Sequence, residues 1–412
     1  MSKTNTAREF DVIVWGATGF TGTLVAEYLM RQYSTDGDLK WAIAGRSKEK
    51  LEKLRNSLGV GPGNLETIVA DSFDQGSLRK LAGRTRVVLT TVGPYALYGS
   101  SLVEACVEAG THYCDLAGEV QWIRKMIDEH QARAQQTGAR IVHCCGFDSV
   151  PMDIGVWFLQ DEAKKRFDAY CKSITLFVKA TKGAASGGTI ASMINLVKEA
   201  RKDHEIARIL VHPYSLNPEG ERQGPDGRDQ QNVVYDENAD SWTAPFVMAS
   251  VNTKVVRRSH ALAAYPYGKD FRYHEAVLTG KGIAGWTKGT MMANAIKALM
   301  IGAALAPTRK LLQKFILPDP GEGPSPELQK SGFFNLMQIG ELPDGTLIET
   351  RITGDQDPGY GSTSKMLSEC AVCLAKDKIT VGGGVWTPAS AMGGLLLERL
   401  TENAGLTFEI RD

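Results

Sequence analysis

Three glycines follow an apolar run in Val12-Ile13-Val14-Trp15-Gly16-Ala17-Thr18-Gly19-Phe20-Thr21-Gly22, and a helical pattern begins directly after them. A strand that feeds a glycine-rich turn into a helix N-terminus can bind phosphate, because free main-chain N–H groups and the positive helix end face the anion. We expect Gly16 to allow a sharp turn, Gly19 a close approach to pyrophosphate, and Gly22 tight packing of the helix on the strand. The predicted site includes the intervening Thr18, Phe20 and Thr21.

The glycine spacing is G-x-x-G-x-x-G and differs from the commoner G-x-G-x-x-G, so a simple turn between any strand and any helix is an alternative. The context favours the phosphate site. The stretch lies near the N-terminus, and a second apolar strand, residues 41–44, follows the helix. This order predicts a βαβ dinucleotide-binding unit.

The end of the second strand indicates which dinucleotide is bound. An enzyme that uses NAD usually has an acidic side chain there for the ribose 2′-hydroxyl, whereas this sequence has Gly45-Arg46-Ser47-Lys48. A guanidinium can form paired hydrogen bonds with a 2′-phosphate, and Ser47 and Lys48 add nearby donors. We therefore predict NADP(H). The alternative is a solvated basic turn that opens the helix over residues 48–58.

Strand ends further along the chain supply the remaining site candidates. A third strand, residues 65–70, ends at Asp71, which could lie near the adenine or cap the helix that starts at Gln75. A fourth strand ends at Gly93-Pro94, where the carboxyl edge of a doubly wound sheet faces the cofactor. We expect Gly93 and Pro94 to contact the cofactor.

One proton donor near the substrate suffices for hydride-transfer chemistry, because the cofactor carries the reactive atom. The candidates are Tyr95, Tyr98 and Asp148, all on loops at the carboxyl side of the predicted sheet. Each also has a structural alternative. The tyrosines could pack at a domain junction, and Asp148 could cap the helix that follows Pro151.

The alternation of strands and helices predicts an α/β fold with an N-terminal Rossmann-type, doubly wound parallel sheet over residues 1–150. The pattern then changes, and residues 151–375 are expected to form an α+β domain with a mixed sheet for substrate binding or dimerisation. A further expectation is that residues 376–412 return to pack on the first domain. The polar stretch 217–240 is predicted to be a surface loop.

The composition excludes several classes of protein. Lys plus Arg and Asp plus Glu number 47 each in 412 residues, so no global charge favours nucleic acid or membranes. The first eight residues lack a secretory pattern, and seven cysteines are consistent with reduced cytoplasmic thiols. No metal site is predicted, since His204 and His212 lack an acidic partner in register and Cys370-Ala-Val-Cys373 lacks a second pair. Buried helical cysteine is the preferred interpretation of that motif.

Residues 288–317 place apolar side chains at helical spacing, with lysines and arginines among them. Burial in the core or at a dimer interface is the default expectation. Weak peripheral association with a membrane is the alternative, since a lipid surface would deliver a poorly soluble substrate.

Together, several motifs resemble the saccharopine dehydrogenase-like oxidoreductases, and more narrowly the branch with the trans-acting enoyl reductases. The similarity covers nearly the whole chain. Besides the glycine stretch, it rests on Ala-Gly-Arg-Ser at 44–47, Val-Gly-Pro-Tyr at 92–95, Gly-Phe-Asp-Ser-Val-Pro at 146–151 with Asp153, Ser-Gly-Gly-Thr at 186–189, Asp-Pro-Gly-Tyr at 357–360 and Gly-Gly-Val-Trp-Thr-Pro at 383–388.

The resemblance implies a nicotinamide cofactor and, in this branch, reduction of a carbon–carbon double bond in a polyketide-derived lipid. Our leading hypothesis is a cytoplasmic, homodimeric NADP(H)-dependent reductase of an apolar acyl substrate. One alternative is an amino-acid dehydrogenase of the saccharopine type, for which Arg257, Arg258 and Arg351 could supply cationic groups. The other is a nucleotide-binding lipid-surface protein without turnover.

Overall fold

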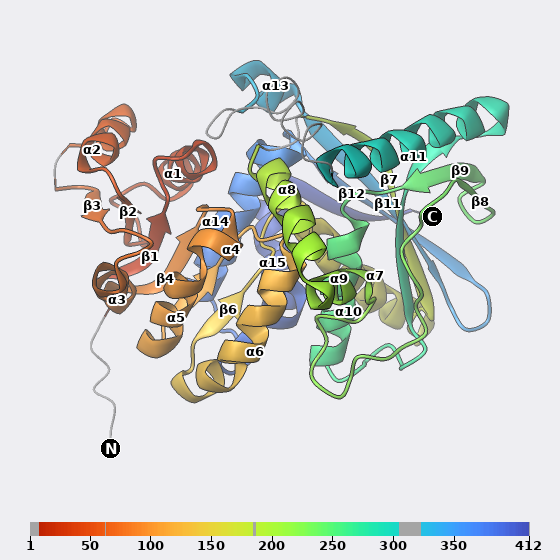
Figure 1. Ribbon diagram of the computed structural model, residues 1–412, viewed down its shortest axis with the longest axis horizontal. Helices are drawn as coiled ribbons and strands as arrows, with labels where there is room; N and C mark the ends of the chain where they lie inside the picture. Colours follow the sequence, from red (N-terminus) through yellow and green to blue (C-terminus); the bar gives the residue numbers. More distant parts are fainter. Residues whose placement is uncertain (1–7, 62, 184–186, 305–322, 412) are drawn as a thin grey trace.

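A parallel sheet forms the N-terminal half of the protein (Figure 1). The computed structural model describes residues 8–61, 63–183, 187–304 and 323–411. The order of the strands in this first sheet is β13-β6-β5-β4-β1-β2-β3, and every pair is parallel. The strands are β1 (Phe10–Trp15), β2 (Trp41–Gly45), β3 (Glu66–Val69), β4 (Thr85–Thr90), β5 (His112–Cys114), β6 (Arg140–Val142) and β13 (Gly384–Trp386).

β1 lies between β2 and β4, and all six of its residues are buried. A parallel strand that is covered on both faces reads as a continuous apolar run, which is why this strand could be predicted. The helices after successive strands are α1 (Phe20–Tyr33), α2 (Lys48–Ser57), α3 (Gln75–Arg84), α4 (Tyr95–Tyr98), α5 (Ser100–Ala109) and α6 (Val120–Thr137). The predicted Rossmann-type, doubly wound sheet is confirmed.

A second, mixed sheet forms the other half, in the order β14-β12-β11-β7-β10-β9-β8. β7 and β10 are parallel and the remaining pairs are antiparallel. The predicted mixed sheet is thus confirmed. Its strands are β7 (Ser173–Lys182), β8 (Val234–Asp236), β9 (Ser241–Pro245), β10 (Arg272–Gly280), β11 (Phe333–Glu341), β12 (Leu347–Gly354) and β14 (Leu406–Arg411). β8 lies inside the stretch expected to be a surface loop.

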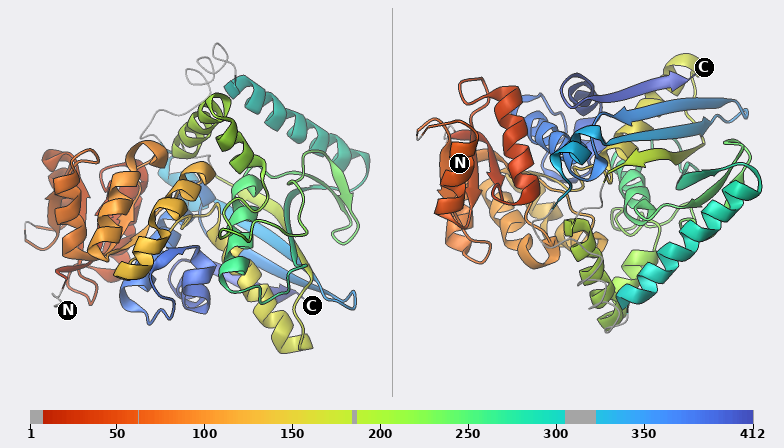
Figure 2. Two further views of the ribbon diagram at one scale, coloured as in Figure 1. Left: turned by 60° about the horizontal axis from the view of Figure 1, so that its bottom comes forward. Right: turned by 90° about the horizontal axis from the view of Figure 1, so that it is seen from above.

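Helices between and beside the two sheets complete the fold. They are α7 (Val150–Phe167), α8 (Gly187–Lys202), α9 (His204–Val211), α10 (Ala249–Leu262), α11 (Gly282–Ala304), α13 (Pro326–Ser331), the π-helical turn η1 (Pro358–Ser362), α14 (Thr363–Lys376) and α15 (Pro388–Glu402). α11 follows the outer edge of the second sheet, where it contacts β9 and β10 (Figure 2).

The end of the chain is divided between the two sheets. β13 pairs with β6 in the first sheet, whereas β14 pairs with β12 in the second. α14, which the sequence assigned to the second domain, packs against α1 and β4. The division at residue 150 therefore describes the order of elements, but residues 363–386 add a helix and an edge strand to the first half.

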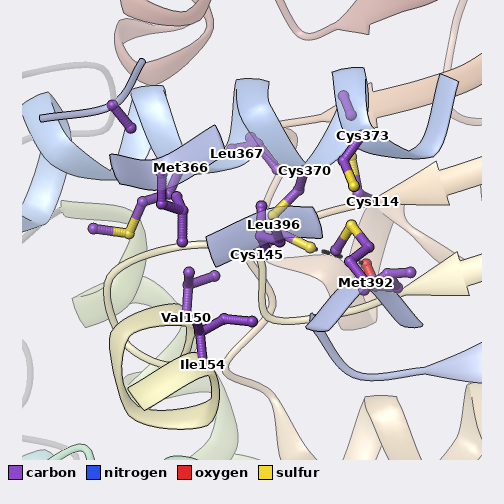
Figure 3. Close-up of a cluster of buried hydrophobic side chains, with 14 of the residues drawn as sticks. Cys114, Cys145, Val150, Ile154, Met366, Leu367, Cys370, Cys373, Met392 and Leu396 are labelled. Carbon is purple, nitrogen blue, oxygen red and sulfur yellow. Dashed lines mark hydrogen bonds between the residues drawn. The ribbon is translucent and has the colours of Figure 1, made fainter. Parts of the chain in front are cut away.

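A continuous hydrophobic core joins the halves. Cys145, Cys370 and Met392 meet there with aliphatic side chains from α7, α14 and α15 (Figure 3). All seven cysteines are free and buried, and Cys370 and Cys373 lie within α14. No cluster of His, Cys, Asp or Glu within the described ranges could hold a metal ion.

The default expectation for α11 was burial of its apolar residues in the core or at a dimer interface, and a single chain tests only burial in the core. Met291 is 69% exposed, Ile301 is 63% exposed, and Leu299 is also exposed, whereas Ala293 is buried. Small residues on one side of the helix allow close packing on the sheet and leave larger side chains outside. Residues 305–317 of the predicted stretch lie outside the described residues. Within the described part of the chain, no helix is long and apolar enough to cross a membrane.

Candidate active site

A cavity of about 770 Å³ opens at the carboxyl edge of the first sheet and continues against the second half of the chain. This volume suits a small-molecule site. From the first half, its wall includes residues of the glycine-rich turn and of the loops after β2, β3, β4, β5 and β6. From the second half, its wall consists of Ser192, Leu196, Val247, Met248, Ser250, Val251, Met300, Gly359, Tyr360 and Thr363.

The three glycines of the first turn have different surroundings. Gly16 has a φ of +85°, and a Cβ there would lie 2.5 Å from Val92 Cγ2. A Cβ on Gly22 would lie 2.1 Å from the carbonyl oxygen of Gly16, so α1 presses against the turn. Gly19 is exposed, and its Cβ would meet only the same oxygen, at 3.3 Å. Gly16 and Gly22 therefore permit packing, whereas Gly19 leaves bare main chain beside the cavity.

The N-terminus of α1 fits an anionic group. Gly19 is the N-cap and offers no side chain to the first turn, which also contains no acidic residue. The first N–H groups of a helix have no acceptor within the helix, and its dipole is positive there. Thr18, Phe20 and Thr21 line the cavity at this point, while Gly22 is buried behind them. A pyrophosphate placed here would satisfy donors that the protein leaves open.

Two cationic side chains, Arg46 and Lys50, line the same cavity. Arg46 follows β2, is exposed, and forms no ion pair or hydrogen bond with the described residues. Lys50 also lines the cavity, whereas Lys48 lies 3.9 Å from Glu52. Ser47 does not line the cavity. Its Oγ accepts a hydrogen bond from the Lys50 N–H at 3.3 Å and caps α2. Lys48, the lysine predicted as a nearby donor, and Lys50 both lie in the first turn of α2, and Lys50 is the one that lines the cavity.

Asp71 shapes the loop after β3 and does not line the cavity. Its Oδ1 accepts from the Phe73 N–H at 2.9 Å, while Asp74 caps α3. This geometry places Phe73 in the cavity wall, where its side chain is 73% exposed and contacts the ring of Tyr98. An exposed aromatic face beside Arg46 can stack on a purine. Sequence reasoning passed over Phe73, whose signal was an aromatic residue in a strand-end turn.

Tyr95 uses its hydroxyl within the protein. The hydroxyl donates to the Thr90 carbonyl at 3.3 Å and accepts from the Leu116 N–H at 3.1 Å. The ring stacks on Trp122, and burial raises the pKa of Tyr95 well above its usual value. These contacts fit the packing alternative better than proton donation. Gly93 and Pro94, just before it, line the cavity as expected of them.

Asp148 is the candidate whose polar group remains available. It lines the cavity, and its carboxyl forms no hydrogen bond with the described residues. Ser149, rather than Asp148, occupies the N-cap position of α7. Burial raises the pKa of the Asp148 carboxyl to about 6, so a proton is held more tightly than on an ordinary aspartate. Tyr98 also lines the cavity, and no hydrogen bond to its hydroxyl is found within the described residues.

Among the described residues of the second half, none that lines the cavity has a cationic side chain. Arg257 pairs with Asp226 at 2.7 Å, and Arg258 donates to main-chain carbonyls of Leu216 and Val385. Arg351 lies in a separate hollow on the second sheet, where it donates to Asn335. The three arginines considered for binding substrate carboxylates therefore do not converge on this cavity.

Comparison with known proteins agrees with this architecture. Residues 12–142 match the saccharopine dehydrogenase NADP binding domain. The chain is 40% identical over 418 residues to a Mycobacterium tuberculosis protein provisionally named a trans-acting enoyl reductase, covering 98% of each. It is 36% identical to the trans-acting enoyl reductase of Mycobacterium bovis, covering 95% of this chain and 96% of that one. Apo saccharopine dehydrogenase (L-Glu forming) from Saccharomyces cerevisiae shares the fold, with a TM-score of 0.53 at 11% identity over 98% and 99% of the two chains.

The Rossmann-type sheet, its open helix N-terminus and these matches define a nicotinamide-dependent oxidoreductase. The chain belongs to the saccharopine dehydrogenase-like oxidoreductases, in the branch that contains the trans-acting enoyl reductases. Ser186, part of one motif that suggested this family, lies outside the described residues.

Proposed function

We propose that the protein is an NADPH-dependent reductase of a carbon–carbon double bond in an apolar acyl or polyketide-derived substrate. The observation that carries the proposal is the contrast between the two parts of the chain that line one cavity. Arg46 and Lys50 line it from the turn and helix that follow β2, whereas the apolar side chains of Leu196, Met248, Val251 and Met300 line it from the second half. The names of the relatives, which describe enoyl reductases, support the same reaction.

The cofactor preference rests on Arg46. Its guanidinium is free among the described residues and can pair with a 2′-phosphate, and Lys50 adds a second positive charge. The residues that would hold the dinucleotide are Thr18, Gly19, Phe20 and Thr21 at the pyrophosphate, Phe73 at the adenine, and Gly93 and Pro94 toward the nicotinamide. When bound, the reduced nicotinamide supplies a hydride.

Asp148 supplies the matching proton in this proposal. Its carboxyl faces the cavity, and the raised pKa leaves a useful fraction protonated near neutral pH. The apolar second-half wall excludes water and holds a hydrocarbon chain beside this group. An aspartate without a hydrogen-bond partner in the described chain can approach substrate more readily than the engaged Tyr95.

An amino-acid dehydrogenase is disfavoured because a substrate with charged carboxylates needs cationic partners. Among the described residues that line the cavity, the cations are Arg46 and Lys50, and both belong to the first half. NADPH consumption measured with α,β-unsaturated acyl thioesters, and NADP⁺ reduction measured with amino acids, separates these alternatives. Turnover of amino acids alone would contradict the proposal, and NADPH binding without any turnover would favour a non-catalytic nucleotide-binding protein.

We also propose that α11 meets a lipid surface. The helix contains no Asp or Glu, Lys288 lies exposed on it, and Met291, Leu299 and Ile301 are exposed apolar residues. Met300, near its end, lines the cavity. A helix with cationic and apolar exposed groups that ends at the cavity suits delivery of an acyl chain from an anionic membrane.

A further inference from the structure

A chain of buried polar side chains leads from the second sheet to the cavity wall. Ser149 lines the cavity directly after Asp148, and its Oγ donates to Asn252 Oδ1 at 3.3 Å. Asn252, on α10, donates from Nδ2 to Glu275 Oε2 at 3.0 Å. Tyr273 donates from its hydroxyl to Glu275 Oε1 at 2.8 Å. All four side chains are at most 3% exposed, so water cannot replace these partners.

The direction of these hydrogen bonds depends on the proton of Glu275. When the Glu275 carboxylate is ionised, it accepts from Asn252 Nδ2, so Asn252 Oδ1 must accept the Ser149 proton and Ser149 offers only lone pairs to the cavity. A protonated Glu275 can donate to the amide oxygen of Asn252 after a half-turn of the amide. The amide nitrogen then donates to Ser149, whose own proton is released toward the cavity.

We propose that Ser149 is a catalytic hydrogen-bond donor to the substrate carbonyl oxygen, and that Asn252 and Glu275 are positioning residues that turn its proton into the cavity when Glu275 is protonated. The inference rests on the proposed enoyl reduction. As a hydride adds to the β-carbon, the π electrons of the double bond shift and the carbonyl oxygen gains negative charge, which a fixed donor stabilises. The α-carbon then takes the proton from Asp148. The two neighbouring residues therefore act on the carbonyl oxygen and the α-carbon, which are both bonded to the carbonyl carbon.

Burial favours the required protonation state by raising the pKa of Glu275 to about 8. Several charged groups lie around the hydrogen-bonded side chains of Ser149, Asn252, Glu275 and Tyr273. Arg257, on α10, favours the ionised form, while Asp229 opposes it. Arg257 is itself engaged by Asp226. The charge of Asp153, on α7, raises the pKa of Tyr273, which is hydrogen-bonded to Glu275. The Asp153 carboxylate accepts hydrogen bonds from the Ser259 hydroxyl and the Ala389 N–H.

Near Ser149, Cys144 also lines the cavity, and its thiol donates to the Ala117 carbonyl at 2.9 Å. The thiol proton is therefore committed within the protein. Ser149 is accordingly the hydroxyl of this loop that can change between donor and acceptor.

Ser149→Ala tests the catalytic contact. We expect kcat for an α,β-unsaturated acyl thioester to fall about a hundredfold, because one donor to the developing charge is lost. The dissociation constant for NADPH, measured by fluorescence, should not change. Unchanged kcat would overturn the role of Ser149.

Glu275→Gln tests the positioning network without a change of shape. A glutamine amide can donate to Asn252 and accept from Tyr273 at every pH, so it imitates the protonated acid. In the parent protein kcat already declines above about pH 6, where Asp148 loses its proton, and this decline should steepen as the pH rises through about 8, where Glu275 loses its proton. In Glu275→Gln the steepening should be absent and activity at pH 7 retained. Glu349→Gln, in the separate hollow on the second sheet, is the matched control and should keep the steepening.

An infrared titration gives a readout that does not need turnover. The apo protein should show the C=O stretch of a buried carboxylic acid that disappears with a midpoint near pH 8 and is missing in Glu275→Gln. Its absence from the parent protein, or an identical steepening of the alkaline decline in Glu275→Gln, would overturn the network. A normal titration without enoyl turnover would contradict the proposed substrate while supporting the protonated Glu275.

Discussion

Arg46 is the residue on which the cofactor preference depends. If its guanidinium pairs with the 2′-phosphate at this exposed site, Arg46→Ala should weaken NADPH binding by about 1.5–3 kcal/mol, because a charge-assisted hydrogen bond is lost. This equals roughly tenfold or more in the dissociation constant. Calorimetry should show NADH binding nearly unchanged. Equal losses of affinity for NADPH and NADH would show that Arg46 does not bind the 2′-phosphate.

Asp148 should give the pH–rate profile a descending limb on the alkaline side of its pKa. Because only the protonated carboxyl can donate, the rate of the chemical step should fall as pH rises through about 6. Asp148→Asn should lose most of the activity and this pH dependence. Single-turnover kinetics between pH 5 and 8 measure both effects. A full rate in the asparagine variant would exclude Asp148 as the proton source.

The free energy of unfolding of Asp148→Asn provides a control for the kinetic experiment. The pKa of Asp148 is raised by burial, so the native state is favoured at low pH and loses stability as pH rises through about 6. Asparagine stays uncharged at every pH, so the variant does not lose this stability. Asp148→Asn should therefore be about 3 kcal/mol more stable than the parent at pH 8 and similar at pH 4, as judged by urea unfolding.

At the scale of the element, two glycines of the glycine-rich turn have different roles: Gly19 is needed for NADPH binding and Gly22 for stability of the fold. Gly19→Val would place a branched side chain over bare main chain beside the cavity, so NADPH binding should be lost while the protein remains folded. Gly22→Ala should instead destabilise the fold, since its Cβ would lie 2.1 Å from the Gly16 oxygen. Circular dichroism melts and NADPH titration distinguish the two results. Retained binding in Gly19→Val would remove Gly19 from the phosphate site.

Local patterns explain which elements could be predicted from the sequence. β1 and its glycine-rich turn are contiguous, and their apolar run and spacing are visible within eleven residues. β13 has only three residues, and its place beside β6 depends on packing over more than 200 residues of chain. Length and periodicity give no signal for such a strand. β11 was not predicted although it is an interior strand of the second sheet, paired with β7 and β12.

The candidate site follows the same rule. Gly16, Gly19 and Arg46 can be recognised from the residues next to them in the sequence, whereas Met248 and Tyr360 reach the cavity only through the tertiary fold. The hydroxyl of Tyr95 could not be assigned in advance, because its partners Thr90 and Leu116 lie on separate strand-end loops. Sequence patterns therefore identified the cofactor half of the site better than the substrate half.

For the whole molecule, the exposed face of α11 predicts reversible association with anionic vesicles. Replacing Met291, Leu299 and Ile301 by Ser should reduce co-sedimentation with phosphatidylglycerol vesicles, because the apolar area that enters the interface is lost. The same changes at Val211 and Leu347, which are exposed elsewhere, are the control and should have no effect.

The oligomeric state decides between lipid and a second copy of the chain. The predicted homodimer should survive the α11 replacements, as measured by light scattering, if this face meets lipid. A parent protein that does not bind vesicles, together with a replaced protein that becomes monomeric, would assign the face to an interface between copies.

The pairing of β13 with β6 also bears on how the protein is made. On the ribosome, strands β1 to β6 emerge early, yet the strand that covers the open edge of β6 is synthesised nearly 250 residues later. α14, which covers β4, also comes late. The nascent nucleotide-binding half must therefore wait with an unpaired edge and an uncovered apolar face, a state that invites aggregation. Its folding can be completed only after β13 and α14 have been synthesised, and chaperones that shield this edge until then should raise the yield of native protein.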